Sequence, residues 1–169
     1  MNEILQQYIN RYVHLNKQEQ ALFSQLLDTK VFGKKALLFE EGQVCRHQYF
    51  LLEGLDRTYY VDCNGNERIT QFGKEHRWVT DMDSFIHETP AKVSIQALEK
   101  TTALVISKER LEEAYQKIPK IERLFRKITE KWLIAQQRHS RFYMKASSKD
   151  RYYGLVQSIP NFVQRVPQY

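Results

Sequence analysis

The stretch that decides the fold is residues 58–70, which read TYYVDCNGNERIT. Two short runs rich in aromatic and β-branched residues flank the pair Asn64-Gly65. Both residues of this pair accept positive φ, as a type I′ turn between two strands requires. The stretch therefore predicts a tight antiparallel β-hairpin.

Short runs of the same kind lie on both sides of this hairpin. Turn residues separate them, notably Glu41-Gly42 and Gly54, and residues 93–98 alternate between apolar and polar side chains as a half-buried strand does. Several short strands at this spacing predict an antiparallel sandwich, roll or barrel and argue against a parallel α/β sheet. The runs are residues 36–39, 49–52, 58–61, 68–72, 93–98 and 103–106.

Helical periodicity precedes the strands. Apolar residues recur every three or four positions from Ile4 to Val13, which predicts a helix with one buried face. Asn16, with Glu19 three residues later, then has the pattern of a capping box that begins a second helix.

The pattern after the strands is a heptad repeat from Ile118 to Phe142, with apolar spacings of 3 and 4 that alternate throughout. A helix over this run would be about 40 Å long. A narrow apolar stripe of that length indicates a two-helix contact between two copies of the chain. The alternative is that the helix lies along the chain's own β-domain. We call these positions the heptad seam: Ile118, Ile121, Phe125, Ile128, Trp132, Ala135, His139 and Phe142. The predicted dimer interface comprises Ile121, Phe125, Ile128, Trp132, Ala135 and His139.

Composition and charge limit the classes of function. Residues 1–107 hold 12 Lys and Arg against 14 Asp and Glu, a net −2, whereas residues 108–169 hold 14 against 6, a net +8. This asymmetry indicates an anionic partner for the last third, or a solvated basic helix. No run is long enough to span a membrane and the first residues lack a signal-peptide pattern, so we expect a cytoplasmic protein without a membrane partner.

Motifs for catalysis or metal binding do not occur. Two cysteines, Cys45 and Cys63, and five scattered histidines show no ligand spacing. The strands lack the His-x-His pattern of a metal-binding cupin, and no phosphate loop or nucleophile elbow is present. We therefore expect no metal, no cofactor and no enzymatic activity.

The order of parts resembles the cyclic-AMP receptor protein/Fnr family of bacterial transcription regulators. That resemblance implies an α+β fold with N-terminal helices, an antiparallel β-roll (double-stranded β-helix or jelly-roll type) and a long C-terminal dimerisation helix. It implies three parts: residues 1–107, helices plus the roll; 108–145, the dimerisation helix; and 146–169, a hinge and the start of a truncated winged-helix DNA-binding domain. The matching motifs are LFEEG at 38–42, YFLLEG at 49–54, the hairpin, the strands at 94–97 and 103–106, and the segments 152–155 and 163–167.

The phosphate-binding cassette departs from the family's pattern. Aligned on Phe85, the family's Gly-Glu pair falls on Thr80 and Asp81, and its Arg-Ser-Ala triplet falls on residues 91–93, AKV. The phosphate-binding arginine is thus missing, and Lys92 beside it lacks the bidentate fork of a guanidinium. We expect no tight binding of cyclic AMP.

An effector pocket is still expected between the roll and the long helix. The resemblance places Thr80, Asp81, Lys92, Gln136 and Gln137 in it. Arg165 and the basic flank of the helix are expected to add at most contacts to nucleic-acid phosphates, which give salt-dependent, non-specific affinity. The expected function is an effector-sensing and dimerisation module of a transcription regulator, which reaches DNA through a C-terminal domain beyond this chain. The alternative is a stand-alone binding domain that regulates a partner protein.

Overall fold

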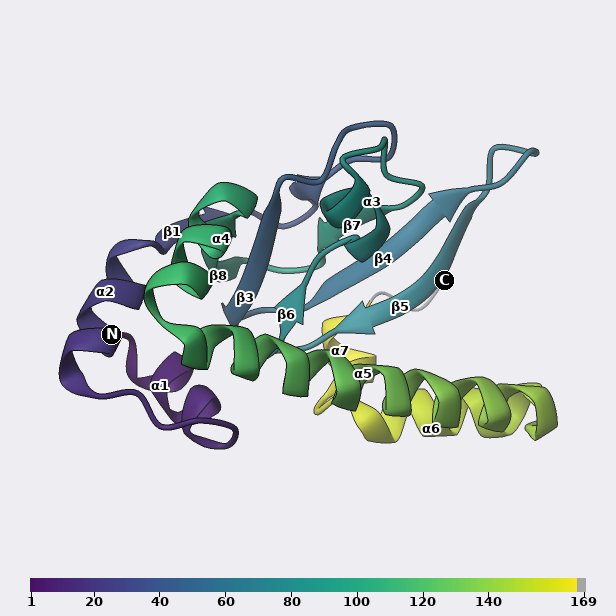
Figure 1. Ribbon diagram of the computed structural model, residues 1–169. Coiled ribbons are helices and arrows are strands. Elements are labelled where there is room, and N and C mark those ends of the chain that lie inside the picture. Colours follow the sequence, from purple (N-terminus) through teal and green to yellow (C-terminus); the bar gives the residue numbers. More distant parts are fainter. Residues whose placement is uncertain (167–169) are drawn as a thin grey trace.

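Asparagine side chains begin both N-terminal helices in the computed structural model, which describes residues 1–166 (Figure 1). Helix α1 (Glu3–Asn10) follows Asn2, whose side chain accepts hydrogen bonds from two backbone amides of the first turn. Helix α2 (Lys17–Gln25) follows Asn16, and the predicted capping box between Asn16 and Glu19 is present. These caps satisfy amides that have no partner within the helix.

The strands form two four-stranded sheets in which every pairing is antiparallel. The predicted α+β fold with an antiparallel β-roll is therefore confirmed. In spatial order, one sheet contains β1 (Asp28–Phe32), β8 (Thr101–Ser107), β3 (His47–Glu53) and β6 (Trp78–Val79). The other contains β2 (Leu37–Phe39), β7 (Ser94–Ala97), β4 (Asp56–Val61) and β5 (Glu67–Gly73).

Two of these strands, β1 and β6, are missing from the sequence prediction. Strand β1 lies at a sheet edge and is mostly exposed, so its sequence carries no alternation of buried and exposed residues. Strand β6 has two residues, Trp78 and Val79, which is too short to show a period. In both cases pairing with a longer neighbour determines the strand, and pairing cannot be seen in the local sequence.

The predicted hairpin exists, but its turn differs from the type I′ expectation. Only Gly65 has positive φ (80°), whereas Asn64 does not. The backbone amide of Gly65 donates to the carbonyl of Asp62, and the Asp62 side chain accepts from the amides of Asn64 and Asn66. The loop is thus a three-residue connection with glycine in the left-handed position. The Asp62 carboxylate makes this longer loop favourable.

Strand β3 explains the apolar run at residues 49–52. Tyr49 and Leu51 face the core between the sheets, while Phe50 and Leu52 face the helices. The strand is therefore buried on both faces, and its sequence is continuously apolar instead of alternating.

The predicted long helical region, residues 108–145, consists of two helices. Helix α4 (Lys108–Lys117) ends at Ile118, and α5 (Pro119–Lys145) begins with the proline. Proline cannot donate to the preceding turn, which is why the helix breaks there. The heptad seam thus starts at the break, and α5 alone spans about 40 Å.

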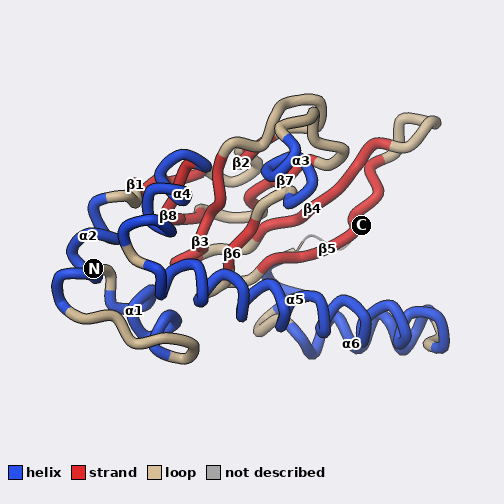
Figure 2. The backbone as a smooth tube through the Cα atoms, in the orientation of Figure 1, coloured by secondary structure: helices blue, strands red, loops and turns tan. Residues whose placement is uncertain are grey.

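The chain then turns back on itself. Helix α6 (Ser148–Ser158) begins with a capping box between Ser147 and Asp150, runs back along α5, and is followed by α7 (Phe162–Arg165) (Figures 1 and 2). A short helix α3 (Met82–His87) follows β6. Among the helices of residues 1–166, none is long and apolar enough to cross a membrane. Residues 167–169 of the predicted winged-helix start lie outside the described residues.

Candidate functional site

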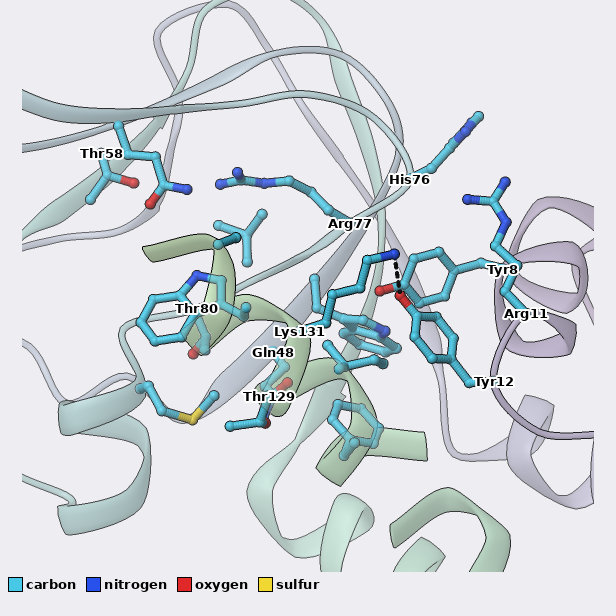
Figure 3. A pocket seen from close by; sticks show the side chains of 18 of the residues that line it. Tyr8, Arg11, Tyr12, Gln48, Thr58, His76, Arg77, Thr80, Thr129 and Lys131 are labelled. Atoms are coloured by element: carbon cyan, nitrogen blue, oxygen red, sulfur yellow. Dashed lines mark hydrogen bonds between the residues drawn. The ribbon is translucent and has the colours of Figure 1, made fainter. Parts of the chain in front are cut away.

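A cavity of about 410 Å³ lies between the roll and α5, where the sequence predicts an effector pocket. The lining residues come from β3 to β7 and the segments next to β6, from α1 and the residues after it, and from α5 (Figure 3). Its lining residues are Tyr8, Arg11, Tyr12, Gln48, Thr58, Gln71, His76, Arg77, Trp78, Val79, Thr80, Met82, Ile95, Phe125, Ile128, Thr129, Lys131, Trp132 and Ala135.

Two lysines of α5 contact the residues that follow α1, beside the cavity. Lys127 Nζ donates to the backbone carbonyl of Tyr12 at 2.9 Å, and Lys131 Nζ lies 3.5 Å from the Tyr12 hydroxyl. The Lys131 ammonium also lies 5.5 Å from the centre of the Tyr12 ring, within range of a cation–π contact. The two helices therefore form one wall that combines positive charge with aromatic surface.

Aromatic side chains form the floor of the cavity. The Trp78 ring packs against Phe50 at 5.3 Å and Phe125 at 5.1 Å between ring centres. Tyr8 packs against Phe50 at 5.0 Å, and burial raises the pKa of its hydroxyl, which therefore stays neutral. Trp78 thus packs against the core and also lines the cavity.

Arg77 brings a guanidinium into the cavity from the start of β6. In Figure 3 its side chain extends toward the side of Thr58. Its Nη1 donates to the backbone carbonyl of Phe72 at 3.4 Å, and its buried Nε has no partner among residues 1–166. Burial lowers the pKa of Arg77, and the carboxylate of Asp56 acts in the opposite direction.

Asp56 lies behind Arg77 and is fully buried. Within the described chain neither of its carboxylate oxygens has a hydrogen-bond partner, and burial raises its pKa to about 6. Both groups meet at Gly73, where a Cβ would lie 1.9 Å from Asp56 Oδ2 and 2.7 Å from Arg77 Nη2. Position 73 therefore requires glycine because a side chain would collide with Asp56 and Arg77, and not because the backbone needs a positive φ.

Thr80 is the one predicted ligand residue that lines the cavity. Its hydroxyl donates to the carbonyl of His47 at 3.1 Å, so it is partly occupied by the roll itself. Asp81 instead caps α3, accepting from the amide of Ser84 at 3.3 Å. Lys92 is exposed and does not contribute to the cavity wall.

Gln136 and Gln137 also lie outside the cavity, because the α5 side chains that enter it end with Ala135. The family resemblance placed both amides in the pocket, whereas the structure has them on α5 just after the residues that line this cavity. The helix positions that do face the cavity include Thr129 and Lys131.

Sequence reasoning missed the charged residues of the site. Arg77 directly precedes the unrecognised two-residue strand β6, and the local sequence contains no sign of its role. Tyr8 and Tyr12 belong to the apolar repeat that predicts a helix with one buried face. The repeat predicts their burial, but it does not show that they line a cavity. Lys131 lies between seam positions and reads as a solvent-facing charge.

The first part of the heptad seam packs inside the chain. Ile121 is completely buried and Phe125 is 8 % exposed, both within the core beneath α1 and α4. The prediction that these two residues belong to a dimer interface is therefore wrong. The chain's own domain covers them, as in the alternative in which the helix lies along the β-domain. At the far end, Phe142 lies against Gly154 of α6. The remaining seam positions are Ile128, which is partly buried, and Trp132, Ala135 and His139, which are exposed.

The C-terminal segment docks on the end of the roll. Ile159 and Phe162 are buried against Leu55, and Phe162 packs edge-on against Phe72 at 5.2 Å. Arg165 pairs with Glu75 and Glu99, so it is not the free phosphate contact that the sequence suggested. Lys74 Nζ donates to the carbonyl of Ser158 at 2.9 Å.

Comparison with known proteins identifies the class to which this fold and cavity belong. Residues 29–118 match the sequence model of the cyclic nucleotide-binding domain family, and the chain belongs to this family. No curated protein sequence matches the chain.

Solved structures share the fold at low sequence identity. A cyclic nucleotide-binding domain from Methylobacillus flagellatus is 17 % identical, with a TM-score of 0.72 over 86 % of this chain and 84 % of that one. The c-di-GMP responsive global regulator CLP of Xanthomonas campestris is 16 % identical, with a TM-score of 0.68 over 88 % and 74 %. The catabolite activator protein of Thermus thermophilus is 17 % identical, with a TM-score of 0.64 over 77 % and 61 %. The chain thus spans about three fifths of that regulator's length.

Proposed function

We propose that this chain is the effector-sensing and dimerisation module of a Crp/Fnr-type DNA-binding transcription regulator. The observation that carries the proposal is the cavity between the roll and α5, together with a C-terminal segment that docks on the same roll. An effector that fills the cavity contacts α5 directly. It can therefore change how α5 and the segment after it are held.

The segment between β5 and β6 supports a route for this change. Lys74 and Glu75 hold the docked C-terminal segment, while the next two residues, His76 and Arg77, line the cavity. This segment is itself tied to β3, because the amide of His76 donates to the carbonyl of Leu51. Binding in the cavity and release of the C-terminal segment would then be linked, and each would change the other by the same free energy.

The exposed seam positions support a dimer contact. Trp132 is 51 % exposed, and Ala135 and His139 follow it at the seam spacing. Two chains that pack α5 helices through these positions would bury the tryptophans, and burial of a large aromatic side chain favours association by about 2 kcal/mol. The proposed assembly is a homodimer in which the two α5 helices pack against each other.

The residues at the positions of the phosphate-binding cassette support the expectation that cyclic AMP binds weakly. Position 91 is a buried alanine, Lys92 is exposed and is not among the residues that line the cavity, and Asp81 is engaged as a helix cap. No cation of the cassette lines the cavity among the described residues. A phosphate held at the cassette positions would lack the charge partner that a buried anion needs.

The alternative is a stand-alone domain of the same family that regulates a partner protein. The packing of α6 and α7 against the roll favours it, because these helices complete a core with Leu55 instead of standing apart. The reading frame after codon 169 tests the choice. A helix-turn-helix encoded there supports the transcription regulator, and a stop codon directly after Tyr169 supports the stand-alone domain.

A further inference from the structure

We infer that the cavity takes a small organic anion with an aromatic or other flat apolar body, and that Arg77 is the residue that binds the anionic group. This inference rests on the proposed sensing function, and it names the chemical class of the effector. It also moves the anion away from the cassette, where the family resemblance places it.

The charges around the cavity indicate the sign of the ligand. Arg11, Arg77 and Lys131 line it, and no Asp or Glu side chain does. The nearest buried carboxylate, Asp56, lies behind Arg77 and is separated from the lining by it. Arg11 and Lys131 are exposed, whereas Arg77 carries a buried Nε without a hydrogen-bond partner in residues 1–166. An anion in the cavity would be attracted to all three, and most strongly to the guanidinium of Arg77, which is the least solvated.

The unpaired polar atoms indicate where the anion binds. Of the residues that line the cavity, Arg77 and Trp78 carry buried side-chain nitrogens, Nε and Nε1, that have no hydrogen-bond partner in residues 1–166. Both nitrogens are donors. A buried donor without an acceptor costs about 1–3 kcal/mol, so an acceptor brought by the ligand is strongly favoured. A guanidinium is also the group that best matches a carboxylate, phosphate or sulfonate fork.

The walls indicate the body of the ligand. Tyr8, Tyr12, Trp78, Phe125 and Trp132 contribute rings to the lining, and the Lys131 ammonium already lies over the Tyr12 ring. Flat apolar ligands stack on such rings, and their burial supplies most of the affinity in sites of this kind. The cavity volume of about 410 Å³ suits a ligand of two or three fused or linked rings.

The inference is tested with two fluorescent probes that share one skeleton. 8-Anilinonaphthalene-1-sulfonate carries an anionic group, and N-phenyl-1-naphthylamine lacks it. Both tryptophans of the chain, Trp78 and Trp132, line the cavity, so energy transfer from tryptophan to the probe reports binding at this place. We expect the sulfonate to bind about tenfold more tightly than the neutral probe, a difference of ~1.4 kcal/mol.

Four proteins are compared: the wild type, Arg77→Met, Asp56→Asn/Arg77→Met and the control Lys92→Met. We expect both Arg77 variants to lose the preference for the sulfonate while their affinity for the neutral probe stays unchanged. The double variant removes both buried charges, so the measurement does not depend on the single variant folding with an uncompensated Asp56. Lys92→Met should behave as the wild type.

Each contrary result has a distinct meaning. If the sulfonate preference persists in both Arg77 variants, or disappears in Lys92→Met, the assignment of Arg77 is wrong. If the wild type binds both probes equally, the cavity is a ligand site but its ligand is not an anion. If neither probe shows energy transfer, the sensing function proposed for the cavity fails with it.

Discussion

The guanidinium of Arg165 is held by the carboxylate of Glu99, with Nε 3.3 Å from Oε2 and Nη2 2.5 Å from Oε1. Glu75 accepts a further hydrogen bond from Nη2, and these contacts raise the pKa of Arg165. Glu75 is two residues before Arg77, which enters the cavity. One short segment therefore joins the docked C-terminal helices to the candidate ligand site.

Replacement of this arginine should release the C-terminal helices. We expect Arg165→Ala to lower the local stability of α7 by about 1–2 kcal/mol, because two carboxylates lose a shared charged donor at a partly buried site. Amide hydrogen exchange in residues 159–166 should speed up about tenfold as a result. Gln164→Ala, an exposed neighbour on the same helix, is the control. Unchanged exchange in Arg165→Ala would show that the apolar contacts of Ile159 and Phe162 alone hold the segment.

Cyclic AMP should bind weakly. Isothermal calorimetry on the intact chain should give a dissociation constant weaker than about 10 µM, since loss of a charged phosphate contact removes several kcal/mol. Lys92→Ala should leave this weak affinity unchanged, because Lys92 does not line the cavity. A micromolar or tighter constant for the wild type would contradict the argument from the cassette.

The buried carboxylate of Asp56 should make stability fall as the pH rises. Burial raises its pKa from 3.8 to about 6, so the folded chain holds this proton over a range in which the unfolded chain has lost it. The folding advantage of the protonated form is complete below about pH 4, decreases through pH 4–6, and is lost above the folded pKa; it amounts to about 3 kcal/mol.

Urea denaturation of the wild type and Asp56→Asn at several pH values between 4 and 7 isolates this effect. The stability of the wild type relative to the variant should decrease as the pH rises through that range. Other carboxyl groups, such as Asp62 and Glu88 with lowered pKa values, contribute equally to both proteins and cancel. Parallel curves for the two proteins would mean that Asp56 is ionised in both states throughout.

The exposed seam should control the oligomeric state. We expect Trp132→Glu/Ala135→Glu to be monomeric in light scattering if the wild type is a dimer through α5, because two added charges would face each other at the contact. Neither residue belongs to the buried core cluster, although both line the cavity, so the fold should survive the change. Arg123→Glu, an exposed change of charge near the start of α5, is the control. A dimer that persists in the double variant would place the interface elsewhere.

The local sequence was sufficient to predict those elements whose own side chains decide their structure. The capping box at Asn16 and the hairpin around Gly65 depend on interactions within a few residues. The strand at 49–52 pairs with the distant β8, but its continuous apolar run is visible in the sequence. Each of these was predicted in place. The class of the domain followed from their order.

Tertiary structure decided the site. Asp56 and Arg77 are far apart in the sequence and meet only because β4 pairs with β5 and β5 leads into β6 at Gly73. The partner of the heptad seam was equally undetermined, since an apolar stripe specifies burial but not the surface that covers it. Here the roll covers Ile121 and Phe125, and α6 packs on Phe142. Local sequence thus determined which elements form, whereas long-range packing determined which charges share the cavity, because burial and charge pairing depend on neighbours that the sequence does not place side by side.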